Sequence, residues 1–154
     1  MVRSARLVLA PLGAAALMLV GCVAHPVGPA RTYAKYEGKA VTTAKSALSA
    51  VESARLTADA ASQGNTFGPY AATVISEAEE SARRVQDTFA SVQSPGPRAD
   101  ALSAELDALL APTVKDLTAL RVAARRGELD RLGTVAAPLG EDSSLLQQFI
   151  DRHR

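Results

Sequence analysis

Residues 99–126 read ADALSAELDALLAPTVKDLTALRVAARR, and this stretch decides the fold. Its apolar side chains recur every three or four residues over most of its length and therefore share one face of an α-helix: Leu102, Leu106, Leu109, Leu117, Leu120 and Ala124. Gly127 follows and suits the left-handed conformation that ends many helices. Pro112 has no N–H to donate to the carbonyl of Ala108, so the sequence predicts that the helix is interrupted there.

Two segments before this stretch show the same helical spacing. Residues 32–63 end before Gly64, and residues 69–93 begin with Pro69, which suits a first helical turn because its missing N–H is harmless there. The second of these segments has a coiled-coil-like stripe: Ile75, Ala78, Ala82, Val85, Phe89 and Val92. The sequence Ser94-Pro95-Gly96-Pro97 then ends it. Two further helices are therefore predicted on the N-terminal side.

A fourth helix is predicted over residues 128–152. Pro138 and Gly140 interrupt its pattern. Ser144 and Gln147 have the spacing of a capping box, which predicts that the helix restarts near residue 144.

Short links between long helices predict antiparallel neighbours. We therefore expect an all-α protein, with an antiparallel up-down four-helix bundle over residues 32–154; a pair of αα-hairpins is the alternative. The composition agrees, because the chain has 31 alanines but only three tyrosines, three phenylalanines and no tryptophan. Strands favour aromatic and β-branched residues, so a mainly β protein is not expected.

The N-terminal residues have the pattern of a secretory signal peptide. Arg3 and Arg6 precede an apolar run over residues 7–20. A run of this length is shorter than the roughly 20 residues that a membrane-spanning helix needs. We assign residues 1–21 to the signal peptide.

The leader ends in Leu19-Val20-Gly21-Cys22, which resembles the lipobox of bacterial lipoproteins. The resemblance covers only this leader. It implies export, cleavage before Cys22, and attachment of diacylglycerol to the Cys22 thiol, so that acyl chains such as palmitate hold the protein on the outer face of the cell membrane. The excess of arginine over lysine, 13 to 4, is similar to that of actinobacterial envelope lipoproteins.

Residues 22–31 form the lipidated cysteine and a short tether that contains two prolines. Arg31, Lys35 and Lys39 follow at intervals of four residues, so they would share one helix face close to the lipid headgroups. Contact between this basic face and the membrane surface is one interpretation, and an ordinary solvated face is the other.

The chain offers few residues for chemistry. Its 17 basic and 16 acidic residues give no excess that would indicate nucleic acid, and a single cysteine with two histidines is too few for most metal centres. His25 lies in the tether, and His153 is expected to interact with the negative end of the last helix. Glu-x-x-His, phosphate-binding and calcium-binding motifs do not occur. We predict no catalytic residue, no metal and no cofactor.

The charged residues of the first two helices have structural interpretations. Glu79 precedes Arg83, and Glu80 precedes Arg84, by four residues, which favours ion pairs on a solvated helix face. Arg55 interrupts the apolar stripe of the first helix. If the first hairpin turns near residue 66, Arg55 faces Glu77, and an ion pair between them is expected.

The two helix-interrupting prolines predict the most polar part of the second hairpin. If the chain turns near residue 127, Pro112 lies opposite Asp142, and five polar residues lie nearby: Thr113, Asp116, Asp142, Ser143 and Ser144. One interpretation is a pair of kinks that bend the helices around the core. The other is a hydrated notch that receives a ligand or a partner's side chain.

The function predicted from the sequence is that of a membrane-anchored cell-envelope lipoprotein. Its non-catalytic helical bundle would contact an unidentified envelope protein or a cell-wall component. The alternative is a bundle that binds or senses a small molecule.

Overall fold

The computed structural model describes residues 30–154. The predicted signal peptide, the predicted lipobox and its Cys22 lie outside the described residues. Within residues 30–154 every regular element is helical, in the order α2 (Tyr33–Ser62), α3 (Gly68–Ala90), α4 (Pro97–Arg125), the 3₁₀-helix η2 (Leu129–Arg131), α5 (Leu132–Val135) and α6 (Leu139–Arg152). The all-α class predicted from the sequence is confirmed for this part of the chain. None of the helices in these residues is both long enough and apolar enough to span a bilayer.

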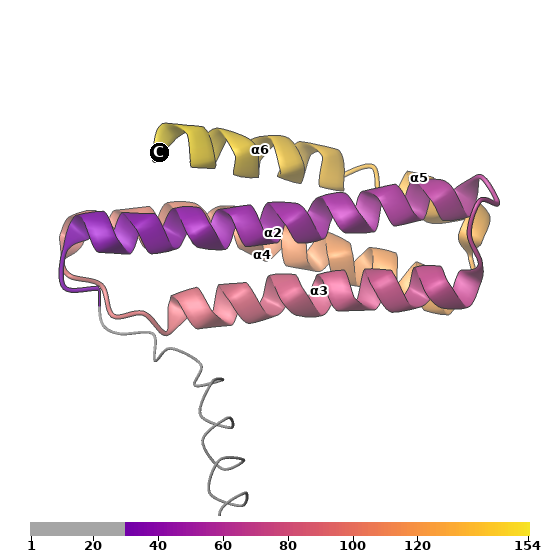
Figure 1. Cartoon of the computed structure of the whole chain (residues 1–154), viewed down its shortest axis with the longest axis horizontal. Helices are drawn as coiled ribbons and strands as arrows, with labels where there is room; N and C mark the ends of the chain where they lie inside the picture. Colours follow the sequence, from indigo (N-terminus) through magenta and orange to yellow (C-terminus); the bar gives the residue numbers. More distant parts are fainter. Residues whose placement is uncertain (1–29) are drawn as a thin grey trace, which may run out of the picture.

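Successive long helices run in opposite directions (Figure 1). Helix α2 packs against α3, α4 and α6, whereas α3 packs mainly against α2 and α4. In Figure 1, α3 and α6 consequently lie on opposite sides of α2. The predicted four-helix bundle is matched only as a helical assembly, because η2, α5 and α6 replace the single fourth helix.

Two helices of different composition supply the centre of the core. The buried residues of α2 are mostly alanines, whereas the large buried residues of α4 are leucines: Ala40, Ala44, Ala47, Ala54 and Ala58 in α2, and Leu102, Leu106, Leu110, Leu117 and Leu120 in α4. Small side chains allow helix axes to approach closely, and large ones fill the space that remains. The alanine face of α2 therefore lets one helix touch three neighbours.

The predicted helix ends are largely correct. Thr32 caps α2 by accepting a hydrogen bond from the backbone N–H of Lys35 at 3.3 Å. Gly64 and Gly127 both have a φ of 74°, the left-handed conformation expected after the first and third helices.

Two expectations about helix breaks are wrong. Pro112 lies inside the continuous helix α4, because packing on both flanks of that turn holds the helix despite one missing N–H. Ser144 does not start a helix: α6 begins at Leu139, directly after Pro138, and the Ser144 hydroxyl donates to the carbonyl of Gly140 at 3.0 Å. The break predicted at Pro138 is present, between α5 and α6.

The predicted core positions are also only partly confirmed. Leu106 and Leu117 are completely buried, whereas Leu48 and Val85 are only partly buried. On α2 most of the fully buried positions are alanines, and Leu48 packs at the edge of the core. The core of the first hairpin is consequently thinner than its leucine and valine positions suggest.

Candidate functional site

A depression of about 270 Å³ opens between α4 and the start of α6. Its lining combines prolines, apolar side chains and carboxylates: Ala108, Leu109, Pro112, Asp116, Pro138, Glu141, Asp142 and Leu145. We call it the Asp142 notch. The structure thus brings together three of the six residues that the sequence suggested for a notch, namely Pro112, Asp116 and Asp142.

The other three suggested residues point elsewhere. Thr113 is completely buried and donates to the carbonyl of Leu109 at 2.8 Å. The Ser143 hydroxyl donates to Glu52 of α2, and that of Ser144 donates to its own helix. Neighbouring helix positions are rotated by about 100°, so Ser143 and Thr113 lie on different faces from Asp142 and Pro112.

Sequence reasoning missed Glu141 and the apolar walls Ala108 and Leu145. Their spacing could have revealed them. Ala108, Pro112 and Asp116 are four residues apart on α4, so they share one face of that helix.

Asp142 is the unusual residue of the notch. It is 8% exposed, and its Oδ2 is buried without any hydrogen-bond partner. Burial, followed by the negative charges of Asp116 and Glu141, raises the pKa of Asp142 to about 6. A buried carboxylate normally has donors, so this group indicates an incomplete site.

Glu79 is a second buried acid, and it has several donors. Arg83 donates to Glu79 Oε1 from Nε at 3.0 Å and from a terminal nitrogen at 2.9 Å. From α4, the Thr118 hydroxyl donates to the same oxygen at 2.7 Å, and Arg121 donates to Oε2. Burial alone would raise the pKa of Glu79, but these hydrogen bonds outweigh it and hold the pKa below its ordinary value.

The predicted solvated face is therefore wrong for Glu79, which is 6% exposed, because α4 covers it and contributes Thr118 and Arg121. The i,i+4 pair between Glu80 and Arg84 does lie on an exposed face, at 2.6 Å. Helical spacing identified both ion pairs correctly, but it could not tell which one lies under a neighbouring helix.

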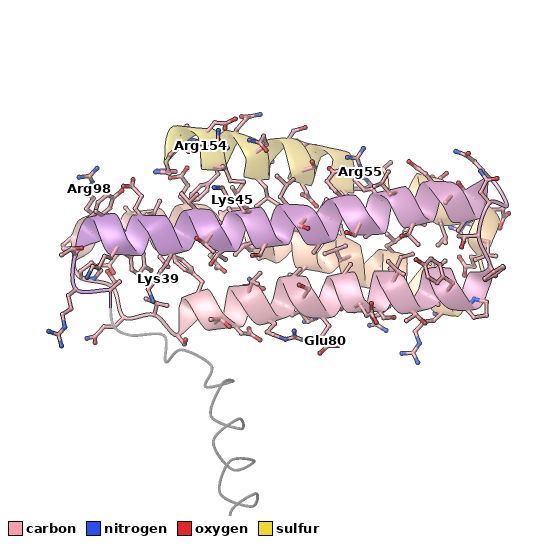
Figure 2. The ribbon with its side chains drawn as sticks, viewed as in Figure 1. Lys39, Lys45, Arg55, Glu80, Arg98 and Arg154 are labelled. Carbon is pink, nitrogen blue, oxygen red and sulfur yellow. The ribbon has the colours of Figure 1, made fainter. Side chains whose placement is uncertain are left out.

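Arg55 does not pair with Glu77. Its guanidinium forms an ion pair with Glu52 at 2.9 Å and lies against Gly140 of α6. Figure 2 shows Arg55 on the side of α2 that faces α6, away from α3, where Glu77 lies. The expected Arg55–Glu77 pair is wrong because the face of α2 that carries Arg55 contacts a different helix.

Basic side chains gather where the described chain enters α2. Arg31 and Lys35 are exposed there, and Lys39 is partly exposed. Arg98, at the start of α4, adds a cation at the same end, with its guanidinium carbon 3.8 Å from the centre of the Tyr33 ring. Figure 2 shows Lys39 and Arg98 at this end of the helices.

His153 joins the C-terminal end of α6 to two other helices. Its Nδ1 lies 3.2 Å from Glu37 of α2, and its Nε2 lies 3.3 Å from Glu105 of α4. The two carboxylates connect the end of α6 to α2 and α4, while the interaction predicted between His153 and the end of its own helix stays a prediction.

Within residues 30–154 no three His, Cys, Asp or Glu side chains are arranged to hold a metal ion. No family model, curated protein or solved structure matches this chain. Functional inference therefore depends on the leader sequence and on the geometry of the helical body.

Proposed function

We propose that this protein is an exported lipoprotein, held on the outer face of the cell membrane by acylated Cys22. Its helices act together as a non-catalytic four-element bundle, with η2, α5 and α6 as the fourth element. The bundle binds another envelope protein or a cell-wall component.

The observation that carries this proposal is that basic side chains gather at the end of the helical body where the chain enters α2. The chain enters α2 at the end that gathers Arg31, Lys35 and Arg98, so a lipid on Cys22 would hold basic side chains against anionic headgroups. In an extended form, residues 23–31 reach only about 28 Å, at roughly 3.1 Å per residue. The anchor and the basic end therefore act on the same surface.

The Asp142 notch does not lie at this basic end, so contact of the basic end with the membrane would leave the notch accessible. In Figure 1, α6 begins beyond the middle of the bundle, on the side away from the start of α2. A partner approaching from outside the membrane could reach the notch without displacing lipid.

Metabolic labelling with an alkyne analogue of palmitate tests the anchor. The wild-type chain is expected to label and to lose its leader, whereas Cys22→Ser should remain unlabelled and keep its leader. The outcome that contradicts the proposal is labelling of Cys22→Ser. Exposed Ser49→Ala is a matched control and should label normally.

A second candidate function, binding or sensing of a small molecule, is favoured by the unpartnered carboxylate in the notch. The volume of about 270 Å³ lies just below the roughly 300–1,000 Å³ of typical ligand pockets. Cross-linking on intact cells separates the candidates: a specific protein or cell-wall adduct supports the first function. Ligand-dependent melting without such an adduct supports the second.

A further inference from the structure

The Asp142 notch has negative groups and no cation to balance them. Asp116 faces it from α4, and Glu141 lies beside Asp142 on α6. On α2, Glu52 and Arg55 pair with each other next to Ser143 and Gly140 of α6. Arg55 is thus already engaged with a carboxylate of its own helix.

The buried oxygen of Asp142 lacks a donor. An unsatisfied buried acceptor is destabilising, and the cost is larger when the group is charged. The rest of the described core contains no other buried side-chain nitrogen or oxygen in this state. A group that brings N–H donors and positive charge would satisfy Asp142 and offset the repulsion from Asp116 and Glu141 at the same time.

The shape of the notch restricts what that group can be. Its walls include Leu109, Leu145 and the rings of Pro112 and Pro138, which suit an aliphatic stem. The volume accommodates the end of one long side chain or a small amine better than a drug-sized molecule. A bare metal ion fits poorly, because the described carboxylates do not form a metal-holding group.

We propose that the Asp142 notch binds a primary ammonium or guanidinium group on an aliphatic stem, with Asp142 as its main acceptor and Asp116 and Glu141 as supporting charges. The group can come from a lysine or arginine side chain or from a small free amine. This inference does not depend on the lipid anchor, because every residue of the notch belongs to the helical body.

The ionisation of Asp142 supports the same conclusion. A bound cation favours the carboxylate over the carboxylic acid, so binding should strengthen as the pH rises through about 6. Asp116 faces Asp142 from α4 and Glu141 lies beside it on α6, whereas the Glu52–Arg55 pair of α2 lies next to Ser143 and Gly140, on another face of α6. The negative charges of Asp116 and Glu141 attract the same cation and therefore also favour its binding.

The test is an NMR titration of the full chain in detergent micelles with n-pentylamine, followed through the backbone amides of Leu109, Glu141 and Asp142. Saturable shifts are expected at about pH 8 and weaker binding at about pH 5. Asp142→Asn should weaken binding about 10- to 100-fold, because it removes a charge-assisted hydrogen bond. Asp151→Asn, the same change at an exposed position of α6, should leave binding unchanged.

Asp116→Asn provides a second variant that keeps Asp142. It should weaken binding less than Asp142→Asn does, because Asp116 supplies only supporting charge. Comparing N-acetyl-lysine methylamide with n-pentylamine distinguishes the sources: tighter binding of the lysine derivative indicates a protein side chain, and tighter binding of the simple amine indicates a free ligand. Either result supports a cation site.

Three results would overturn the proposal. The first is equal shifts with 1-pentanol, which would show that only the apolar stem is recognised. The second is n-pentylamine binding that is unchanged in Asp142→Asn. The third is saturable binding of calcium at the notch without binding of either amine. Loss of palmitate labelling would leave the cation site unaffected, so failure of the anchor and failure of this site are distinguishable.

Discussion

Glu79 and Asp142 are two acids that are almost equally buried, on opposite flanks of α4, yet their pKa values are shifted in opposite directions. Glu79 is 6% exposed and accepts hydrogen bonds from Arg83, Thr118 and Arg121. Asp142 is 8% exposed and has a buried oxygen with no donor. Burial alone therefore does not decide the direction in which the pKa of an acid shifts; the hydrogen-bond donors and charges around it do.

The two acids should also make stability depend on pH in opposite ways. The lowered pKa of Glu79 stabilises the fold above the ordinary value of 4.5, and this contribution is lost as the pH falls through the folded-state pKa. The raised pKa of Asp142 gives a contribution that is fully present below 3.8 and is lost as the pH rises through about 6. At neutral pH the ionised Glu79 therefore stabilises the contact between α3 and α4, whereas the ionised Asp142 lowers the free energy of unfolding.

The largest expected effect comes from removing the satisfied acid. Glu79→Ala should lower the free energy of unfolding by about 3 kcal/mol, because it leaves the partly buried Arg121 without its partner. Urea denaturation measures the change. Glu80→Ala is the matched control, since it removes an exposed pair with Arg84 and should cost less than about 1 kcal/mol. Equal costs for the two variants would remove the distinction between Glu79 and a surface acid.

Neutralising the unsatisfied acid, Asp142, should instead raise the free energy of unfolding. A pKa of about 6 against an ordinary 3.8 corresponds to about 3 kcal/mol of lost stability above pH 6. The amide introduced by Asp142→Asn would still be unpaired, so this variant is expected to gain only about 2 kcal/mol at about pH 8. Its unfolding free energy should no longer fall between about pH 4 and 6. Destabilisation by Asp142→Asn at neutral pH would show that the carboxylate has a partner in the folded protein.

Restoring the backbone hydrogen bond that Pro112 cannot make should produce a smaller gain in stability. Pro112→Ala gives α4 an N–H that can reach the carbonyl of Ala108, and a gain of about 0.5–2 kcal/mol is expected in thermal unfolding. If the proline shapes the notch for binding, the same variant should bind n-pentylamine more weakly. A stabilised variant with unchanged amine binding would show that Pro112 has no role in the binding of the amine.

The smallest effect concerns one donor of Glu79. Thr118→Val keeps the shape of the side chain and removes a hydroxyl that lies 2.7 Å from Glu79 Oε1, so a loss of about 1 kcal/mol is expected in urea. The pKa of Glu79, followed by NMR, should rise toward that of an ordinary acid. No change in that pKa would mean that the two arginines alone keep Glu79 ionised.

The sequence predicted the level of the notch along the second hairpin, but it did not predict which helix Ser143 and Arg55 face. Two prolines and an assumed turn near residue 127 were sufficient to place Pro112 close to Pro138 and Asp142. Residues that are equally far from the turn along the two helices of a hairpin lie at the same level. Ser143 was misplaced because a rotation of one residue turns it toward Glu52 of α2. The pairing of Arg55 with Glu77 failed for a related reason: the correct level along the hairpin does not fix the direction in which a side chain points.

Local sequence determined the features of this protein that depend on neighbouring residues along the chain. These include the helices and most of their ends, the glycine at each turn and the spacing of the leucine stripe. Only the tertiary structure decided which face of each helix meets which neighbour, and hence that Glu79 gains donors from α4 while Asp142 gains none. The physical reason is that periodicity fixes the angle between two side chains on one helix. The rotation of that helix against its neighbours depends on packing of the whole core, in which the small alanines of α2 allow three helices to approach.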